Sequence, residues 1–560
     1  MKGTGWLAAC LVLLACSAGS SKGGAEIRGS GDVPAEDIAG DLVMGPDGAT
    51  DQQTADSSEG TDSGTDLGTD SGTTDAGAVD AAEVLALDLV AGAFDGNIVL
   101  GAPTATAVSA AVFSASLNGK VHFVYGTKPG EYAGESPALP LTAGVPTQGN
   151  MEALAADTRY YYRLYYEAQD GEGSGYTDEH TFHTARSSGS TFSFGIQGDS
   201  HPERIGKMFS PDLYALNMKN AAEKELDFYL AMGDDFSIEK LIEKDQLTEA
   251  NVNLVYQNQQ DFFGLVGHSA PVFLVNGNHE QAAGYLLSEA YPTPYADAPV
   301  LAGKARVTWF ALPGPGEFYS VDPMEVAGVG RVRDYYAWEW GDALFVVIDP
   351  YWHSPVPVDT GVPGVEKEKD EWKKTIGDEQ YQWLKTTLEG SKAKYKFVFE
   401  HHALGCGRGA AGMAHTYEWG GYDEKGKNFE FPTRRPAWDL PVHQLMQANH
   451  VTIFFFGHDH LFAREKVDGI VYQSLPNPAD NTYTAFNADA YDPDSIPFPG
   501  AVYEPDYGVV LPNSGFVQVT VAPAGVTVSY VRAVVPGDEA LAGCANGDVP
   551  ITYSVTASNL

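Results

Sequence analysis

The 560-residue chain predicts an α/β fold in its larger C-terminal part and an all-β sandwich ahead of it. Two observations support this expectation. In the C-terminal part, short apolar runs typical of buried strands alternate with helical patterns, and several of these runs are followed directly by ionisable side chains. In the preceding part, apolar and polar residues alternate with a period of two, as in strands with one buried face.

The first sixteen residues have the features of an export signal. Lys2 precedes an apolar stretch of about eleven residues, which is shorter than the roughly 20 needed to cross a bilayer. The end of this stretch, Leu13-Leu14-Ala15-Cys16, resembles the bacterial lipobox, in which Cys16 becomes the lipid-modified first residue. We expect an exported lipoprotein of the bacterial cell envelope, at the outer membrane or cell surface. The alternative is a secretory signal with an incidental cysteine.

Residues 17–85 are rich in Gly, Ser, Thr, Asp and Ala, with a near-repeat of four residues over 60–71. Such a composition cannot bury a core and predicts a disordered, self-repelling acidic linker. Fifteen acidic residues against Lys22 and Arg28 give this segment −13 of the net charge of −41. Binding to nucleic acid depends on basic surface, so we expect no nucleic-acid partner and membrane contact only through the lipid anchor.

Residues 86–187 predict a β-sandwich. Asn118-Gly119 is a typical hairpin turn, and the alternating segment 120–125 follows it as a strand would. The segment 154–164 resembles the corner and following strand of a fibronectin type III domain, in which a Tyr hydroxyl bonds to the backbone. Residues 182–184 resemble the last strand of such a domain. We expect this domain to act as a spacer or as a wall of the active-site mouth.

Residues 190–535 contain five short motifs with metal-binding side chains. They are Gly198-Asp199-Ser200-His201, Gly233-Asp234-Asp235, Gly277-Asn278-His279-Glu280, His401-His402 and Gly457-His458-Asp459-His460. Each follows an apolar run that predicts a buried strand: 192–196, 228–232, 271–275, 397–399 and 451–456. Because ligands bind at the carboxyl ends of strands in open α/β sheets, we expect the five motifs to converge in space.

The chemistry of these side chains points to two metal ions. Carboxylate, imidazole and amide oxygen suit Mn, Fe or Zn, whereas softer thiolate sites would need Cys, which is nearly absent from the chain. Two ions about 3.5–4 Å apart can clamp a phosphoryl group and lower the pKa of a shared water to about 7, which supplies hydroxide at neutral pH. His279 can donate a proton to the leaving-group oxygen. The motifs therefore predict P–O bond hydrolysis.

The order of the motifs resembles the calcineurin-like metallophosphoesterase superfamily. The resemblance implies a four-layer α/β/β/α sandwich, preceded here by the fibronectin- or Ig-like domain. It also implies the ligands: Asp199, His201 and His460 for one metal, Asn278, His401 and His458 for the other, and Asp234 bridging both, with His279 as the acid. A sandwich ahead of the catalytic part is similar to the purple-acid-phosphatase-like branch. Ser237, however, stands where those enzymes have a metal-bound Tyr, which implies a colourless site.

Helices are expected at about 212–224, 248–263 and 379–389, the last with Trp383 and Leu384 facing inward. Three long stretches rich in Gly, Pro and aromatic residues, at 281–331, 405–436 and 476–512, are expected to be loops that shape the substrate pocket.

His402 and Arg408 are candidates for contact with phosphate, whereas Asp235, Asp459 and Glu280 are expected to support neighbouring groups rather than bind metal. Cys406 and Cys544 are expected to form a disulfide, since paired cysteines in an exported protein usually bond. This bond would attach the C-terminal extension, residues 536–560, to the loop after His402. Two buried free thiols are the alternative.

The predicted function is hydrolysis of a small phosphorylated substrate, with phosphomonoesters as the first choice. A phosphodiesterase or nucleotide hydrolase could use the same ligand set. A different class, a surface-binding lipoprotein without turnover, also stays open.

Overall fold

The computed structural model describes residues 94–169, 173–289, 295–402, 408–409, 414–491 and 508–556. The chain divides into two compact units, 1–81 and 82–560, and all described residues belong to the second. The predicted signal with Cys16 and the predicted linker 17–85 therefore lie outside the described residues. None of the helices in the described ranges combines the length and hydrophobicity required to cross a membrane.

The N-terminal part of the described chain is built from β-strands only. One sheet has the order β1 (Asn97–Gly101), β2 (Val108–Phe113), β6 (Thr147–Met151). The other centres on β3 (Gly119–Gly126) and β7 (Arg159–Ala168), flanked by β4 (Gly134–Glu135), β5 (Leu139–Leu141), β8 (Gly175–Tyr176) and β9 (His180–His183). Leu100 and Val112 of the first sheet and Phe123 and Leu164 of the second share one core. Two sheets over one core confirm the predicted β-rich domain.

Two sequence features of this sandwich have the predicted structure, and one does not. Tyr160 forms the expected corner, because its hydroxyl accepts a hydrogen bond of 2.8 Å from the backbone N–H of Ala155. The last strand is β9, as expected. The Asn118-Gly119 turn, however, does not form a hairpin, since β2 pairs with β1 and β6 while β3 pairs with β7. The turn therefore connects the two sheets.

Two large sheets form the centre of the catalytic part. The first has the order β12 (Val272–Leu274), β11 (Phe228–Ala231), β10 (Phe192–Gln197), β23 (Gly515–Ala522), β24 (Gly525–Arg532), β25 (Ile551–Val555). The second has the order β13 (Ser320–Val321), β16 (Tyr336–Trp340), β17 (Ala343–Val347), β18 (Tyr395–Glu400), β19 (Ile453–Phe456), β21 (Ile470–Ser474), β20 (Phe462–Val467), β22 (Val509–Leu511). Strands β10 to β12 are parallel, as are β17, β18, β19 and β21. The five predicted strand runs are confirmed as β10, β11, β12, β18 and β19.

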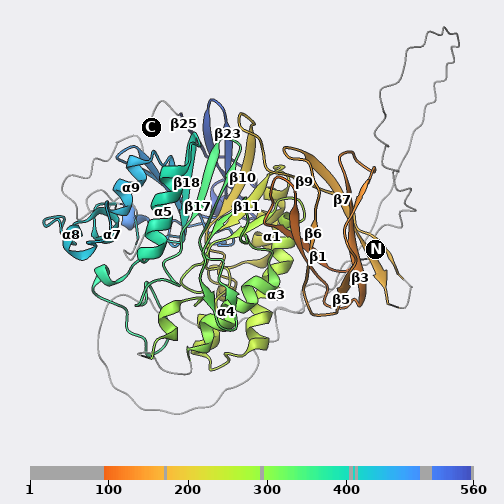
Figure 1. Ribbon diagram of the computed structural model, residues 1–560, viewed down its shortest axis with the longest axis horizontal. Helices are drawn as coiled ribbons and strands as arrows, with labels where there is room; N and C mark the ends of the chain where they lie inside the picture. The colour runs from red at the N-terminus through yellow and green to blue at the C-terminus, as the bar shows by residue number, and fades with distance from the viewer. Residues whose placement is uncertain are drawn as a thin grey trace, which may run out of the picture. The chain divides into compact units, whose positions relative to one another are not determined.

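Helices cover the outer face of each sheet (Figure 1). Within the described ranges the α-helices are α1 (Pro211–Ala222), α2 (Glu239–Glu243), α3 (Glu249–Gly267), α4 (Asp297–Trp309), α5 (Asp378–Gly390), α7 (Tyr417–Gly420), α8 (Phe431–Arg434), α9 (Val442–Ala448) and α10 (Glu539–Ala542). One core packs α1, α3 and α4 against β11 and β12. A second joins the two sheets face to face, and a third packs α5 and α9 on the second sheet. Three cores between four layers confirm the predicted α/β/β/α architecture.

The expected helices are confirmed as α1, α3 and α5. Leu384 of α5 is buried as predicted, whereas Trp383 is half-buried and its indole N–H donates to Ser320 Oγ at 2.7 Å.

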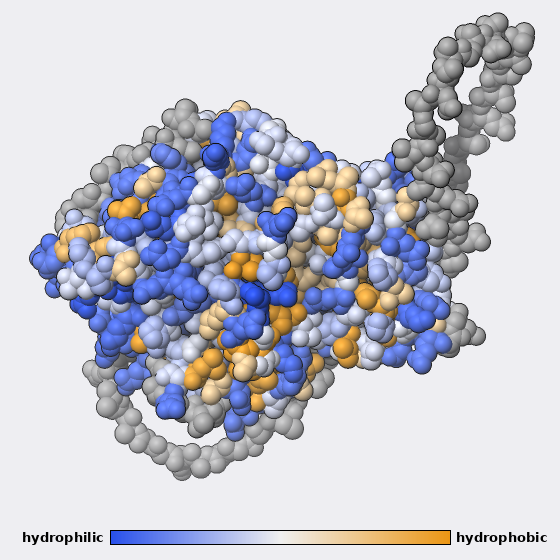
Figure 2. Space-filling model, viewed as in Figure 1, coloured by the Kyte–Doolittle hydropathy of each residue, from blue (hydrophilic) through white to orange (hydrophobic). Residues whose placement is uncertain are grey.

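The expectation of one long loop over 281–331 was wrong, because this stretch contains α4 and three short strands, β13, β14 (Glu325–Val326) and β15 (Gly330–Arg331). Ala298, Ala302, Ala305 and Trp309 are buried along one face of α4, at helical spacing. Small alanines give this face a weak hydrophobic signal, and Pro and Gly around it suggest a loop. Figure 2 shows apolar residues gathered over α3 and α4 on a face that is otherwise largely hydrophilic.

The sandwich packs directly on the layer of α3 and α4. The rings of Phe113 and Trp309 lie 5.0 Å apart, and the Gln148 side-chain amide donates to the carbonyls of Val307 and Thr308 at 2.9 and 3.0 Å. Near the end of α3, the Tyr162 hydroxyl donates to the His268 carbonyl at 2.6 Å. The sandwich is therefore joined to the catalytic part by apolar and hydrogen-bonded contacts.

Candidate metal centre

The five motifs meet where the parallel strands of both catalytic sheets end. The loops after β10, β11 and β12 supply Asp199, Asp234 and Asn278, and those after β18 and β19 supply His401 and His458. All seven predicted ligands, which include His201 and His460, are between 0% and 7% exposed. The structure therefore brings the ligand atoms of six of these residues close together and buries the seventh, Asn278, in the loop after β12.

One half of the centre is formed by His201, His460 and Asp199. The two Nε2 atoms of His201 and His460 lie 3.0 Å apart, and His460 Nε2 lies 2.9 Å from Asp199 Oδ2. The Nδ1–H of His201 donates to Glu203 Oε1 at 3.0 Å. This bond fixes the proton on Nδ1, so the lone pair of His201 Nε2 points at the other two ligands.

The other half surrounds His401. Its Nδ1–H donates to the Met232 carbonyl at 2.7 Å, and because a carbonyl can only accept, Nδ1 must carry the proton. His401 Nε2 lies 3.2 Å from Asp234 Oδ2 and 3.9 Å from Asp199 Oδ2. It has no hydrogen-bond partner, nor has the buried amide oxygen of Asn278. The ligand atoms of His401 and Asn278 are thus buried and available.

These atoms have the chemistry and spacing that metal ions require. Donor atoms on one ion with bonds of about 2.0–2.1 Å lie about 3.3 Å apart in a tetrahedral site. Asp199, Asp234, His401 and His458 have ligand atoms within 4.8 Å of one another, as do Asp199, His201 and His460. Burial by itself lowers the pKa of His401, but the charges of Asp234 and Asp199 outweigh it and raise this pKa to about 10. The negative charges of the two aspartates therefore favour a positive charge at this site.

Glycine and left-handed backbone shape the loops that hold the ligands. A Cβ on Gly457 would lie 2.5 Å from Asp199 Oδ1, so a larger residue would displace that carboxylate. His201, Asp234, His458 and His460 all have φ between 51° and 66°. Non-glycine residues with positive φ are uncommon and concentrate at functional sites.

Glu280 joins two of the motif loops. Its carboxylate accepts hydrogen bonds from the backbone N–H groups of Asp234, Asp235, Phe236 and Gly277, at 2.6 to 3.0 Å. It therefore supports the loop of Asp234 rather than a neighbouring histidine. Asp235 accepts from Ser200 Oγ at 2.6 Å, and Asp459 accepts from the Gly409 N–H at 2.9 Å.

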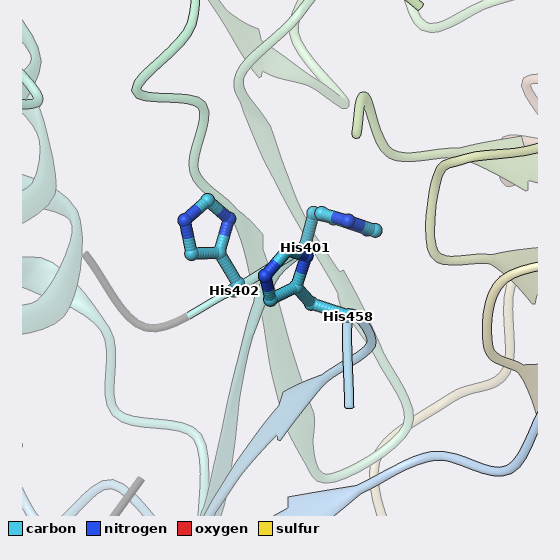
Figure 3. A group of neighbouring side chains, drawn as sticks. All are labelled: His401, His402 and His458. Atoms are coloured by element: carbon cyan, nitrogen blue, oxygen red, sulfur yellow. The ribbon is translucent and has the colours of Figure 1, made fainter. Parts of the chain in front are cut away.

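His402 lies beside two of the candidate ligands, His401 and His458 (Figure 3). Its ring stacks on His458 with centroids 4.4 Å apart, and ligand nitrogens of His401, His402 and His458 lie within 4.8 Å of one another. The Tyr351 hydroxyl is 2.7 Å from His402 Nδ1. Burial, and then the charge of His401, lower the pKa of His402 to about 3, so its ring is neutral.

Arg408 borders the centre but is engaged with the protein itself. Its guanidinium donates to the His458 carbonyl and lies 3.6 Å from Asp459 Oδ1, with 34% of the side chain exposed. The predicted disulfide stays a prediction: among the described residues Cys544 is a free cysteine that packs against the apolar cluster of Leu213 and Val534. Cys406 lies outside the described residues.

Three residues that the sequence did not single out surround His279. Its Nε2 lies 3.3 Å from a guanidinium nitrogen of Arg204 and 3.9 Å from Asp234 Oδ2, and its Nδ1 lies 3.3 Å from Glu239 Oε2. Burial lowers the pKa of His279, but Asp234, Glu239 and Glu203 together raise it above its usual value. Glu203 and Arg204 follow the first motif after one residue, Pro202, and this proximity was the available signal. Nothing in the sequence connects Glu239 to His279.

Similarity to one solved structure supports the fold. The purple acid phosphatase PPD1 from seeds of yellow lupin (Lupinus luteus) is 14% identical, with a TM-score of 0.50; the match covers 82% of this chain and 74% of that chain. GAP50, the anchor in the inner membrane complex of Plasmodium, is 13% identical with a TM-score of 0.32, covering 65% of this chain and 89% of that chain. No curated protein sequence matches significantly.

A family model described as calcineurin-like phosphoesterase matches residues 192–462. The matched range starts at β10 and ends at the first residue of β20, so it contains all five motifs. Residues 192–462 therefore form a calcineurin-like phosphoesterase domain, which belongs to a family of metal-dependent phosphoester hydrolases.

Proposed function

We propose that this domain hydrolyses phosphate monoesters at a centre of two metal ions, drawn from Mn, Fe and Zn. The observation that carries the proposal is the buried set of ligand atoms that lack hydrogen-bond partners, above all His401 Nε2 and Asn278 Oδ1. Buried polar atoms are rarely left unpaired, because desolvation without a partner costs about 1–3 kcal/mol each. Bound cations satisfy these atoms and offset the charges of Asp199 and Asp234.

The metal ions, when bound, supply water activation and neutralise charge on the phosphoryl group. Asp199, His201 and His460 would hold one ion, Asn278, His401 and His458 the other, and Asp234 would bind both. His279 would hold a proton at Nε2 once Arg204, whose guanidinium donates to this atom at 3.3 Å, turns to the substrate, and Glu239 beside Nδ1 would stabilise the charged ring. His279 is thus placed to protonate the departing oxygen.

Arg204 supports the choice of a monoester. Its guanidinium reaches His279 Nε2 at 3.3 Å, and its side chain is 30% exposed, so it can also face a bound substrate. A monoester carries more negative charge on its terminal oxygens than a diester does, and a guanidinium binds such oxygens through paired N–H groups. A diesterase on the same ligand set is the alternative.

A paired assay tests the proposal. Metal-loaded protein is given an aryl phosphate and the corresponding bis-aryl phosphate, and Asp234→Asn serves as the inactive control. We expect the higher kcat/KM on the monoester and loss of turnover in the variant. Higher kcat/KM on the diester would reassign the substrate class. Bound metal without turnover of either ester would instead favour a surface-binding role.

We also propose that the chain is exported and lipid-modified at Cys16, which the sequence Leu13-Leu14-Ala15-Cys16 supports. Expression in a bacterial host with radiolabelled palmitate is expected to label wild-type protein and not Cys16→Ser. Labelling of both proteins, or of neither, would contradict this assignment.

A further inference from the structure

A second group of metal-binding side chains lies outside the five motifs. Asp322 follows β13, Asp334 precedes β16, and His353 lies in the loop after β17. The ligand atoms of these three residues lie within 4.8 Å of one another. His353 Nε2 is 2.8 Å from Asp334 Oδ2 and 3.6 Å from Asp322 Oδ2. Three segments that are separate in the sequence thus meet at one point.

Both carboxylates of this cluster are buried and only partly satisfied. Asp322 Oδ1 accepts the Met324 N–H at 2.8 Å, but its Oδ2, which faces His353, has no hydrogen-bond partner. Asp334 Oδ1 has none either, and the two residues are 1% and 0% exposed. The nearby guanidinium of Arg306 is engaged elsewhere, because its nitrogens donate to the carbonyls of Arg333 and Leu274.

Such a cluster needs a cation or a bound proton. Burial, and then repulsion from Asp334, raise the pKa of Asp322 to about 8. The distances of 2.8 and 3.6 Å from His353 Nε2 bracket the separation of about 3.3 Å that two donors have on one tetrahedral ion. Two oxygens and one imidazole nitrogen suit Zn²⁺ or Mn²⁺ better than Ca²⁺, which prefers oxygen ligands alone.

We propose that Asp322, Asp334 and His353 bind a third divalent ion of the Zn²⁺ or Mn²⁺ class. Three protein ligands leave one position for water, and the 12% exposure of the His353 side chain gives solvent a route to it. The ion would connect the loop after β17 to the start of β16. Because the same loop carries Tyr351, whose hydroxyl contacts His402, the site also holds one wall of the catalytic centre in place.

Counting bound zinc tests this proposal. Wild-type protein, Asp334→Asn and His353→Gln are loaded with Zn²⁺, dialysed against zinc-free buffer and measured by plasma mass spectrometry. We expect each variant to hold one zinc ion per chain fewer than wild type. Asp342→Asn is the matched control, since it removes a carboxylate that bonds Ser188 and Gly189 away from the cluster, and it is expected to keep the wild-type number.

His353→Gln keeps both carboxylates, and circular dichroism verifies that each variant is folded. The rise in melting temperature on adding Zn²⁺ is expected to be smaller in the two cluster variants than in wild type and Asp342→Asn. Equal zinc content in all four folded proteins would overturn the proposal and assign a shared proton to the cluster.

Discussion

At the scale of single residues, Glu203 controls which nitrogen of His201 is available to a metal. Its carboxylate accepts the Nδ1–H at 3.0 Å and leaves the Nε2 lone pair facing His460. Glu203→Gln removes the charge that holds this tautomer, and loss of such a supporting contact typically costs about 10–100-fold in metal affinity or activity. We therefore expect a 10–100-fold weaker affinity for one of the two ions, measured by competition with a chelator.

Glu225→Gln is the control for this experiment, because Glu225 is an exposed carboxylate that pairs with Arg159. It is expected to leave metal affinity unchanged. If Glu203→Gln binds both ions as tightly as wild type, the assigned role of Glu203 is wrong.

The ligand set could be predicted from the sequence because each motif combines metal-binding residue types with a preceding apolar run. The residues that contact these ligands could not be predicted from the sequence. Tyr351 meets His402 only because the loop after β17 passes the end of β18, and Glu239 reaches His279 from a short helix with no motif. These contacts depend on packing between segments that local sequence patterns do not connect.

At the scale of structural elements, the turn after β19 depends on a residue without a side chain. A Cβ at Gly457 would approach Asp199 Oδ1 to 2.5 Å, so Gly457→Ala must move either the carboxylate or the turn. A displacement of about 1 Å at a catalytic centre can cost about 100-fold in rate. We expect Gly457→Ala to lose at least about 100-fold in kcat/KM for an aryl phosphate.

Gly390→Ala provides the comparison, since a Cβ at Gly390 meets no atom within 4 Å. It is expected to keep wild-type activity. Full activity of Gly457→Ala would show that the turn tolerates the added atom.

The corner of the sandwich can be tested without touching the catalytic centre. Tyr160→Phe removes the acceptor of the Ala155 N–H bond, a loss of about 1 kcal/mol in the free energy of unfolding. Urea unfolding followed by circular dichroism measures this loss, and activity on the aryl phosphate is expected to be retained. Tyr161→Phe is the control. Equal free energies of unfolding for the two variants would show that the Tyr160 hydrogen bond does not stabilise the sandwich.

Strands were easier to predict than connections. Continuous apolar runs such as 453–456 identify buried strands directly, since both faces of each strand are covered. Helix α4 was missed because alanines mark its buried face. The Asn118-Gly119 pattern predicts a hairpin, but a local pattern cannot reveal that the chain passes to the other sheet.

At the scale of the whole molecule, acid is expected to weaken the contact between the sandwich and the catalytic part. His180 of β9 stacks on His268 after α3, with centroids 4.4 Å apart. Burial first, then the charges of His268 and Arg163, lower the pKa of His180 to about 3. In the unfolded chain the pKa of a histidine is about 6.5. As the pH falls from about 6.5 towards about 3, protons therefore bind the unfolded chain more readily than the folded one, and the stability that is fully present above about pH 6.5 is progressively lost.

Urea unfolding at pH 7.5 and 5.5 measures the effect. One such histidine contributes at most about 1.4 kcal/mol per pH unit to the loss of stability. His180→Gln cannot gain this proton, so its free energy of unfolding is expected to depend less on pH than that of wild type. An equal pH dependence of the two proteins would exclude His180 as the group responsible.

Anomalous X-ray diffraction from crystals of metal-loaded protein tests the central claim most directly. The account predicts two peaks about 3.5–4 Å apart, one beside His201 and His460 and one beside His401 and His458, with Asp234 between them. Diffraction data with no anomalous peak among these residues, although the crystals contain metal, would contradict it.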